Sequence, residues 1–473
     1  MATTYRNPNA PLSERGRTDS TDQFSRPRLN PGDPLPSDQR VSVGVLVDLE
    51  RTSQAGGHIR CWEHFAEGAL AFPDALDLTV YFLGQRTETT RLGSNVRLCT
   101  LKAQFGTADL SWLQQGAGNT DLTPFHVGLA RQIGHHHVLH ATAVFAFART
   151  AKIMSRYCGL PLIASLHTDF PKFTEVYARE IITQLLGAGR IGRWMSERSG
   201  IVNAYARSMQ RSIRALANRS SHVLYSREQD HAWLVDLKGK EHVTRLRRGI
   251  NKDLYHPDRC DRSWLKQRFN IDEDRFVLLF VGRADASKNV MTAALAARRL
   301  LHLGRPVHFF LAGDGADREA VRSTLGSDAT LPGYLAPDML AAVYASADVF
   351  VFPSRSEIMP NVVLEAKASG LPPVVDAGEA SAQLVALPGV DGLLVGEETP
   401  LAWAMAIDQL IQSPSRHLAM REAARTWIED VAPSWQQVVS EDLLPVWQAA
   451  ARSVAQRQDR VAGGFGGPPT PAR

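Results

Sequence analysis

Two glutamates with seven residues between them, Glu357 and Glu365, lie in the segment Ser354–Gly370 (SRSEIMPNVVLEAKASG). Pro360 suits the first turn of a helix, because proline has no amide hydrogen to leave unbonded there. A helix that begins there offers free backbone amides and the positive end of its dipole to a phosphate. On the preceding loop, Glu357 can accept hydrogen bonds from sugar hydroxyls, and Glu365 can reach a ribose diol. A capping acid before a surface helix would explain Glu357 alone.

Two cations follow the apolar run Phe276–Gly282. Gly282-Arg283 ends this run, and Lys288 lies five residues further on, in a turn before a helix that begins near Val290. A guanidinium and an ammonium at the end of a strand can clamp the two phosphates of a nucleotide sugar. Taken alone, the pair would also be compatible with two surface cations.

Glycines follow the next apolar run, in Gly313-Asp314-Gly315. Glycine lets the backbone approach a ligand closely, although this short pattern is weak evidence by itself.

The elements that must position these residues are parallel strands, because strand-like runs alternate with helical patterns throughout. The predicted strands are Val41–Leu49, Leu76–Leu83, Val138–Ala143, Leu162–His167, Ser221–Ser226, Phe276–Gly282, Val307–Ala312, Ala347–Phe352 and Pro373–Val375. Open α/β sheets bind ligands at the carboxyl ends of their strands, and the residues above follow strands. We therefore expect two facing Rossmann-like domains with a cleft between them.

The expected organisation divides the 473 residues into two domains and two tails. Residues 1–39 are too polar to fold alone and are expected to be disordered, as is the Gly/Pro-rich tail 462–473. Residues 40–247 form the N-terminal domain and 248–434 the C-terminal domain. The amphipathic segment 435–454 is expected to pack back on the N-terminal domain.

Composition excludes several classes of protein. The sequence has no apolar stretch long enough to span a membrane and no secretory signal pattern, which favours a cytoplasmic enzyme. Widely spaced cysteines predict neither a disulfide framework nor a zinc site: Cys61, Cys99, Cys158 and Cys260. Adjacent residues such as His135-His136-His137 do not easily face one metal ion, so we expect no metal there. Nothing in the charge pattern indicates a nucleic-acid partner.

Positive charge is concentrated in Gly187–Ser220, where seven arginines stand against one acid, Glu197. Apolar residues such as Trp194 and Tyr205 are interleaved with them. A basic amphipathic segment suits an anionic membrane surface or an anionic acceptor, and a solvated helix with an apolar core face is the alternative.

The ordered motifs resemble the retaining GT-B glycosyltransferases called group 1, or family 4. Glu357 and Glu365 match the E-x7-E element of that family. Its other signatures are matched in order by Gly56-Gly57, His167-Thr168-Asp169, Arg248-Gly249-Ile250-Asn251 with Tyr255-His256-Pro257, Gly282-Arg283 with Lys288, Gly313-Asp314-Gly315, and Ser369-Gly370-Leu371-Pro372. The resemblance extends from about Val41 to about Val454.

The resemblance implies a role for each matching residue. Arg283 and Lys288 would stabilise the leaving diphosphate, Glu365 would hold the ribose, and Glu357 would position the donor sugar. His167 would contact that sugar from the acceptor side. The amides of Gly56 and Gly57 would meet the phosphates. The remaining donor-binding positions would be Gly282, Gly313, Gly315, Met359, Pro360 and Asn361.

The resemblance further implies a nucleotide-sugar co-substrate, an acceptor glycan or lipid, and no metal or other cofactor, since fixed cations take the place of Mg²⁺. One position departs from the family pattern: Ile358 stands where glycine usually follows the first glutamate. A reshaped sugar pocket is the favoured consequence and a weakened catalyst the other. The alternatives in function are a non-hydrolysing sugar-nucleotide epimerase and a non-catalytic relative that binds nucleotide sugars.

Overall fold

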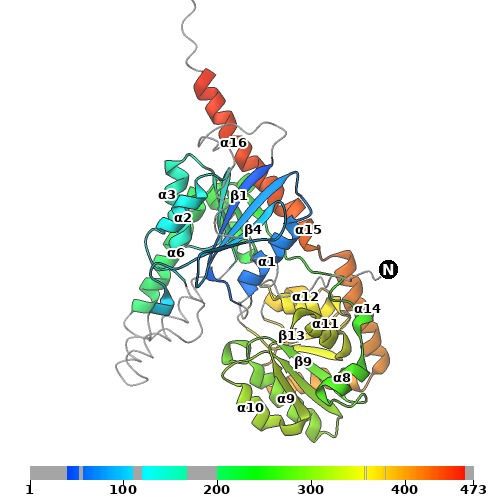
Figure 1. The fold of residues 1–473 in the computed structure, drawn as a ribbon. Helices are drawn as coiled ribbons and strands as arrows, with labels where there is room; N and C mark the ends of the chain where they lie inside the picture. Colours follow the sequence, from blue (N-terminus) through cyan, green and yellow to red (C-terminus); the bar gives the residue numbers. More distant parts are fainter. Residues whose placement is uncertain are drawn as a thin grey trace, which may run out of the picture. The chain divides into compact units, whose positions relative to one another are not determined.

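The computed structural model describes residues 40–52, 57–109, 120–167, 200–355, 357, 359–378 and 380–463. The chain divides into two compact units, Arg248–Ser434 and the remainder, which joins residues up to Arg247 with those from Trp435 onward. We call them the C-terminal and N-terminal domains (Figure 1). Each is described by itself. Among the described residues, no helix is both long enough and apolar enough to cross a membrane.

The N-terminal domain is built on one sheet, with the order β3-β4-β2-β1-β5-β6-β7-β8 in the described part of the chain. Its strands are β1 (Val41–Glu50), β2 (Leu76–Leu83), β3 (Glu88–Arg91), β4 (Val96–Leu101), β5 (Val138–Ala141), β6 (Leu162–Leu166), β7 (His222–Tyr225) and β8 (Val243–Arg245). All pairings are parallel except that of β3 with β4. The strand order changes direction between β1 and β5, which makes this the switch point where ligands of such sheets bind.

Both faces of this sheet are covered. The helices are α1 (Gly57–Ala69), α2 (Val127–Ile133), α3 (Ala146–Tyr157), α6 (Ile201–Arg219), α7 (Glu228–Lys238), α15 (Trp435–Val438) and α16 (Leu444–Gly463), the last two joined by a π-helical stretch, Val439–Leu443. On one face, Trp62 of α1 shares a core with Trp435 and Trp447 from the end of the chain. Residues of α2, α3 and α6 pack on the other face. The helix α16 runs two residues into the tail that was predicted to begin at Ala462.

The C-terminal domain has its own parallel sheet, with the order β11-β10-β9-β12-β13-β14 among the described residues. The strands are β9 (Phe276–Val281), β10 (Val307–Ala312), β11 (Ala329–Gly333), β12 (Val349–Phe352), β13 (Pro373–Asp376) and β14 (Leu393–Val395). The helices are α8 (Arg262–Phe269), α9 (Val290–His302), α10 (Arg318–Leu325), α11 (Pro337–Ser346), α12 (Asn361–Ala368), α13 (Pro400–Ile411) and α14 (Pro414–Asp430). Its switch point lies between β9 and β12.

Some predicted boundaries are wrong by one or two residues. The strand predicted over Val138–Ala143 ends at Ala141, and the one predicted to begin at Ala347 begins at Val349. Pro360 caps α12 from outside, with an extended backbone conformation, and Asn361 is the first helical residue. The fixed φ of Pro360 therefore restrains the residue that precedes the helix, not a residue of its first turn.

Candidate active site

The switch point of the C-terminal domain brings together two of the predicted catalytic residues. Lys288 follows β9, Glu357 follows β12, and the Lys288 ammonium forms an ion pair with the Glu357 carboxylate. Both side chains are more than four-fifths buried, at 18% and 17% exposure. Glu357 also accepts a hydrogen bond of 3.1 Å from the Ser354 hydroxyl. A cation and an acid 69 positions apart are thus paired where ligands of this sheet type bind.

The turn after β9 is fixed by its own side chains. The Asp285 carboxylate accepts hydrogen bonds from the backbone N–H groups of Ser287 (3.0 Å) and Lys288 (3.3 Å). The Arg283 guanidinium donates to the Ser287 hydroxyl at 2.9 Å and lies 3.3 Å from Asp285. Arg283 is therefore held against the turn that carries Lys288, with about half of its side chain (47%) exposed to solvent.

Gly313 and Gly315, after β10, have to be glycines because the backbone of the loop after β9 leaves no space for a side chain there. A Cβ on Gly313 would lie 1.9 Å from the Gly282 carbonyl oxygen, and a Cβ on Gly315 would lie 2.4 Å from that of Ala284. Gly282 and Gly313 also have φ values of +146° and +147°, which other residues rarely adopt. These glycines let the loops after β9 and β10 pack backbone against backbone, which places Arg283 and Lys288.

The helix α12 carries the second glutamate. Glu365 accepts a hydrogen bond of 3.0 Å from the hydroxyl of Tyr344, on α11. Burial, and then the Glu365 charge, raise the pKa of Tyr344 well above its usual value, so its hydroxyl stays a donor. At the start of the helix, the side-chain oxygen of Asn361 is buried without a hydrogen-bond partner among the described residues. Sequence reasoning missed Tyr344, because its helix is apolar and resembles ordinary core.

The same helix is anchored by a buried lysine. The Lys367 ammonium donates to the Leu384 carbonyl at 2.7 Å and to Asp391 at 2.9 Å, and lies 3.7 Å from the centre of the Trp427 ring. Its side chain is completely buried. These contacts fix α12, and with it Glu365, against the rest of the domain.

In the N-terminal domain, a second polar pair bridges the switch point between β1 and β5. His58, in the first turn of α1, shares a hydrogen bond of 3.1 Å with the hydroxyl of Thr142, which directly follows β5. Gly57 begins α1, with open space where a side chain would be, whereas Gly56 lies outside the described residues. Sequence reasoning missed His58 and Thr142, although His58 adjoins the glycine pair.

His167, at the end of β6, lies beside this pair. Its ring nitrogens hydrogen-bond to the hydroxyls of Ser165 (2.8 Å) and Ser226 (3.2 Å). Its ring lies 4.9 Å from that of His58, centre to centre, and only 3% of the residue is exposed. The predicted acceptor-side histidine is thus oriented by two serines, while Thr168 and Asp169 lie outside the described residues.

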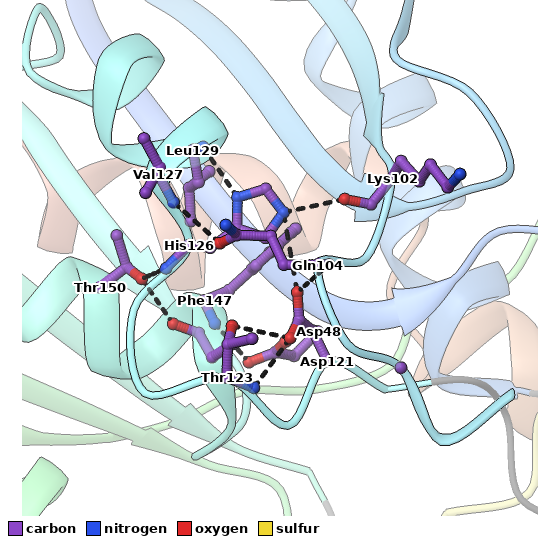
Figure 2. A network of polar contacts seen from close by, with 12 residues as sticks. Asp48, Lys102, Gln104, Asp121, Thr123, His126, Val127, Leu129, Phe147 and Thr150 are labelled. Atoms are coloured by element: carbon purple, nitrogen blue, oxygen red, sulfur yellow. Dashed lines mark hydrogen bonds and ion pairs between the residues drawn. The ribbon is translucent and has the colours of Figure 1, made fainter. Parts of the chain in front are cut away.

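A buried polar network surrounds Asp48 (Figure 2). It lies on the face of the sheet that α2, α3 and α6 cover, whereas His58 and His167 lie on the face that α1 covers. The Asp48 carboxyl, near the end of β1, accepts hydrogen bonds from the amides of Phe147 (2.9 Å) and Ala148 (3.4 Å) in the first turn of α3. Its other oxygen has no partner among the described residues. Burial raises the pKa of Asp48 to about 8, and neighbouring Asp121 adds to this. Asp48 therefore stays protonated at neutral pH.

The histidine run and the arginine-rich segment have structural contacts. His136 is buried between the hydroxyls of Ser42 (3.0 Å) and Tyr81 (2.9 Å), and no cluster of metal ligands occurs in the described ranges. Of the segment Gly187–Ser220, residues 187–199 lie outside the described part. In the remainder, Arg214 lies over the Trp233 ring, 5.5 Å from its centre.

Comparison with known proteins places these features in a family. Residues 275–413 match the family model "Glycosyl transferases group 1". The chain is 28% identical over 355 residues to D-inositol 3-phosphate glycosyltransferase 1 of Catenulispora acidiphila, which covers 72% of this chain and 78% of the relative. It is 31% identical to a GDP-mannose-dependent alpha-mannosyltransferase of Mycolicibacterium smegmatis, over 58% of this chain and 65% of the relative.

Solved structures share the fold. The Anabaena protein HepE, in complex with UDP and glucose, superimposes with a TM-score of 0.59 at 16% identity, over 90% of this chain and all of that one. Sucrose-phosphate synthase from Thermosynechococcus elongatus gives 0.60 at 16% identity, with the same coverage. The resemblance expected from the sequence motifs is confirmed. Residues 275–413 therefore resemble the group 1 glycosyltransferases, and the chain as a whole has the GT-B fold.

Proposed function

We propose that this protein is a retaining glycosyltransferase that moves a sugar from a nucleoside-diphosphate sugar to an acceptor glycan or lipid without a metal ion. The observation that carries the proposal is the pairing of Lys288 with Glu357 at the switch point of the C-terminal sheet. Arg283 on the same turn and Glu365 on the following helix complete the set that the family resemblance predicts.

Each residue has a role in the proposed reaction. Lys288 and Arg283 stabilise the negative charge that develops on the diphosphate as its bond to the sugar breaks. Glu357 accepts hydrogen bonds from the sugar hydroxyls, and Glu365, oriented by Tyr344, holds the ribose. Two fixed cations supply the charge that a metal ion provides in other transferases.

The family resemblance implies that the donor's anomeric configuration is retained, and this reaction needs no protein base. The acceptor oxygen forms a bond to the anomeric carbon on the face from which the diphosphate leaves. Its proton passes to the departing diphosphate, so the products are a glycoside with retained configuration and a nucleoside diphosphate. NMR of the first product formed tests this, since an inverted anomer would refute a retaining mechanism.

The names of relatives guide the choice of substrates. The mannosyltransferase relative is named as dependent on GDP-mannose, and HepE was solved with UDP. GDP- and UDP-sugars are therefore the donors to test first, by thermal shift followed by product analysis. Binding of a donor without transfer to any acceptor would favour the non-catalytic alternative, and isomerisation of the donor would favour the epimerase.

Independence from metal has its own test. We expect activity to survive exhaustive treatment with EDTA, because Lys288 and Arg283 provide the positive charge at the diphosphate. Activity that is lost on chelation and restored by Mg²⁺ or Mn²⁺ would contradict the metal-free part of the proposal while leaving sugar transfer intact.

A further inference from the structure

A cavity of about 530 Å³ lies in the N-terminal domain where strands β6 and β7 begin, whereas His167 lies where β6 ends. Its walls include the starts of β6 and β7, the last turns of α3, α6 and α7, and residues Ser453 and Val454 of α16. The volume falls within the range of about 300–1,000 Å³ that is typical of small-molecule sites. No residue proposed to act on the sugar donor lines it.

Among the described residues, three cations and no acid line the cavity. Arg156 comes from α3, Arg219 from α6 and Lys238 from α7, and no aspartate or glutamate is among the residues of its wall. Arg219 is one of the arginines in the basic run of the sequence, so part of that run contributes to a concave site.

The hydrogen bonds within the cavity leave much of this charge unmatched. The Lys238 ammonium donates to the Asn218 carbonyl at 3.1 Å, and the Arg219 guanidinium donates to the Ser155 hydroxyl at 3.4 Å. In the described part of the chain, Arg156 takes part in no hydrogen bond or ion pair. None of the three has a carboxylate partner among the described residues.

The surroundings agree with a positive potential. Burial lowers the pKa of Lys238, and no carboxylate opposes this effect. The pKa of His222, at the start of β7, is lowered to about 4 by burial and by the charges of His242 and Lys238. A carboxylate close to this corner would shift both groups in the opposite direction.

The simplest alternative is that each cation only balances the negative end of its own helix. Arg156, Arg219 and Lys238 all lie in last turns, where a cation gains from the helix dipole. That explains each residue by itself. It does not explain why the last turns of three helices, each with a cation, line the same cavity.

We propose that this cavity binds a phosphate-bearing anion of small-molecule size, at a site separate from the proposed donor site. Two guanidinium groups can each grip phosphate oxygens in a fork, and the ammonium adds a point charge. A bound anion would balance the positive charge of the residues that line the cavity. A soluble phosphate compound and a phospholipid headgroup share this chemistry, and the experiment separates the two sources.

The test is calorimetric titration of the full chain with inorganic pyrophosphate. We expect the double variant Arg156→Gln/Lys238→Gln to weaken pyrophosphate binding at least about tenfold at this site, because two charge-assisted contacts are lost. Binding should also weaken as salt rises. The matched control, Lys152→Gln/Arg211→Gln, removes two exposed cations from α3 and α6 that do not line the cavity, and it should bind like wild type.

Lys288→Ala separates this site from the donor site. In that variant, the pyrophosphate binding assigned to the cavity should remain unchanged while binding at the donor site weakens about tenfold or more, so failure of one proposal leaves the other testable. Wild-type binding that disappears entirely in Lys288→Ala, or equal affinity in the two double variants, would overturn the inference. Thermal melting of each variant shows that it is folded.

A second arm identifies the source of the phosphate. Phosphatidylcholine vesicles with and without phosphatidic acid are added to the protein with pyrophosphate bound. Displacement by the phosphatidic acid vesicles alone assigns the cavity to a lipid headgroup, and its absence assigns it to a soluble phosphate compound.

Discussion

At the scale of single residues, Lys288 and Arg283 carry the positive charge that the proposed reaction needs. We expect Lys288→Ala and Arg283→Ala each to lower turnover about ten- to a hundredfold, because losing a charge-assisted hydrogen bond to developing phosphate charge costs about 1.5–3 kcal/mol. Steady-state kinetics with the preferred nucleotide sugar measures the effect. Arg322→Ala, on the exposed side of α10, is the control. Turnover at the wild-type rate would remove these residues from the leaving-group site.

Tyr344 has a narrower role, because it reaches the ribose only through Glu365. We expect Tyr344→Phe to raise the donor KM about five- to tenfold with little change in kcat, since one hydrogen bond of about 1 kcal/mol is lost. With a 2′-deoxyribose donor, the substitution should have a smaller effect. An equal effect on both donors would mean that Tyr344 only supports the core. Tyr157→Phe, on the exposed surface of α3, is the matched control.

A functional residue can be predicted from the sequence when its neighbours in the chain identify it, but not when its partners are distant in the sequence. Lys288, Arg283 and the two glutamates follow strands at fixed spacings, so their positions could be predicted. His58, Thr142 and Tyr344 acquire their partners only through the tertiary fold: the hydrogen bond of His58 spans 84 positions and that of Tyr344 spans 21. No local pattern specifies such contacts.

At the scale of elements, the central strands were predictable and the outer ones were not. β1, β2, β9 and β10 are buried on both faces and form long apolar runs, as strands of parallel sheets do. The missed strands β3, β8, β11 and β14 lie at sheet edges. β3 has the sequence ETTR and is largely exposed, so no apolar run marks it. The missed β4 pairs with both β2 and β3, but Arg97 interrupts its apolar pattern.

The contact between β1 and α3 predicts a pH dependence of stability. The pKa of Asp48 is about 8 in the folded protein, against an ordinary value of 3.8. Between these values the folded state holds a proton that the unfolded state has released, so the free energy of unfolding falls as pH rises, by up to about 1.4 kcal/mol per pH unit. Below pH 4 and above pH 8 this contribution is constant.

The experiment compares the wild type with Asp48→Asn, which has a neutral side chain of the same shape at every pH. We expect the melting temperature of the variant, relative to that of wild type, to increase from pH 5 to pH 8. Other titrating groups are common to both proteins and cancel in the difference. A difference that stays constant over this range would show that Asp48 is ionised in the folded protein.

At the scale of the whole molecule, the arginine-rich segment Gly187–Ser220 is expected to hold the enzyme at anionic membranes. In its described part, Arg207 and Arg211 are exposed on α6, and 53% of Tyr205 is exposed. Each basic residue near such a surface contributes about 1 kcal/mol, and salt screens the attraction beyond roughly 10 Å. We therefore expect co-sedimentation with vesicles that contain anionic lipid, decreasing as salt rises.

The variant for this test changes Arg207, Arg211 and Arg214 to glutamate, and it should remain in the supernatant. Its control carries the same number of charge reversals on the C-terminal domain, at Arg298, Arg299 and Arg322, and should sediment like wild type. If neither wild type nor control sediments, or if all three proteins sediment equally, the segment is a solvated helix and the case for a lipid acceptor loses its main support.

The last segment of the chain, from Trp435 onward, packs in the N-terminal domain, and this has a consequence for the order of folding during synthesis. Trp435 and Trp447 belong to the core of the N-terminal domain, and Trp447 donates a hydrogen bond of 3.2 Å to His140 in β5. Residues 248–434, in contrast, form a continuous unit that is complete before Trp435 has been translated. The domain that is synthesised second can therefore fold first. Until residues 435–451 have been synthesised, the nascent N-terminal domain keeps part of one apolar sheet face uncovered, and apolar surface exposed in this way is prone to aggregate.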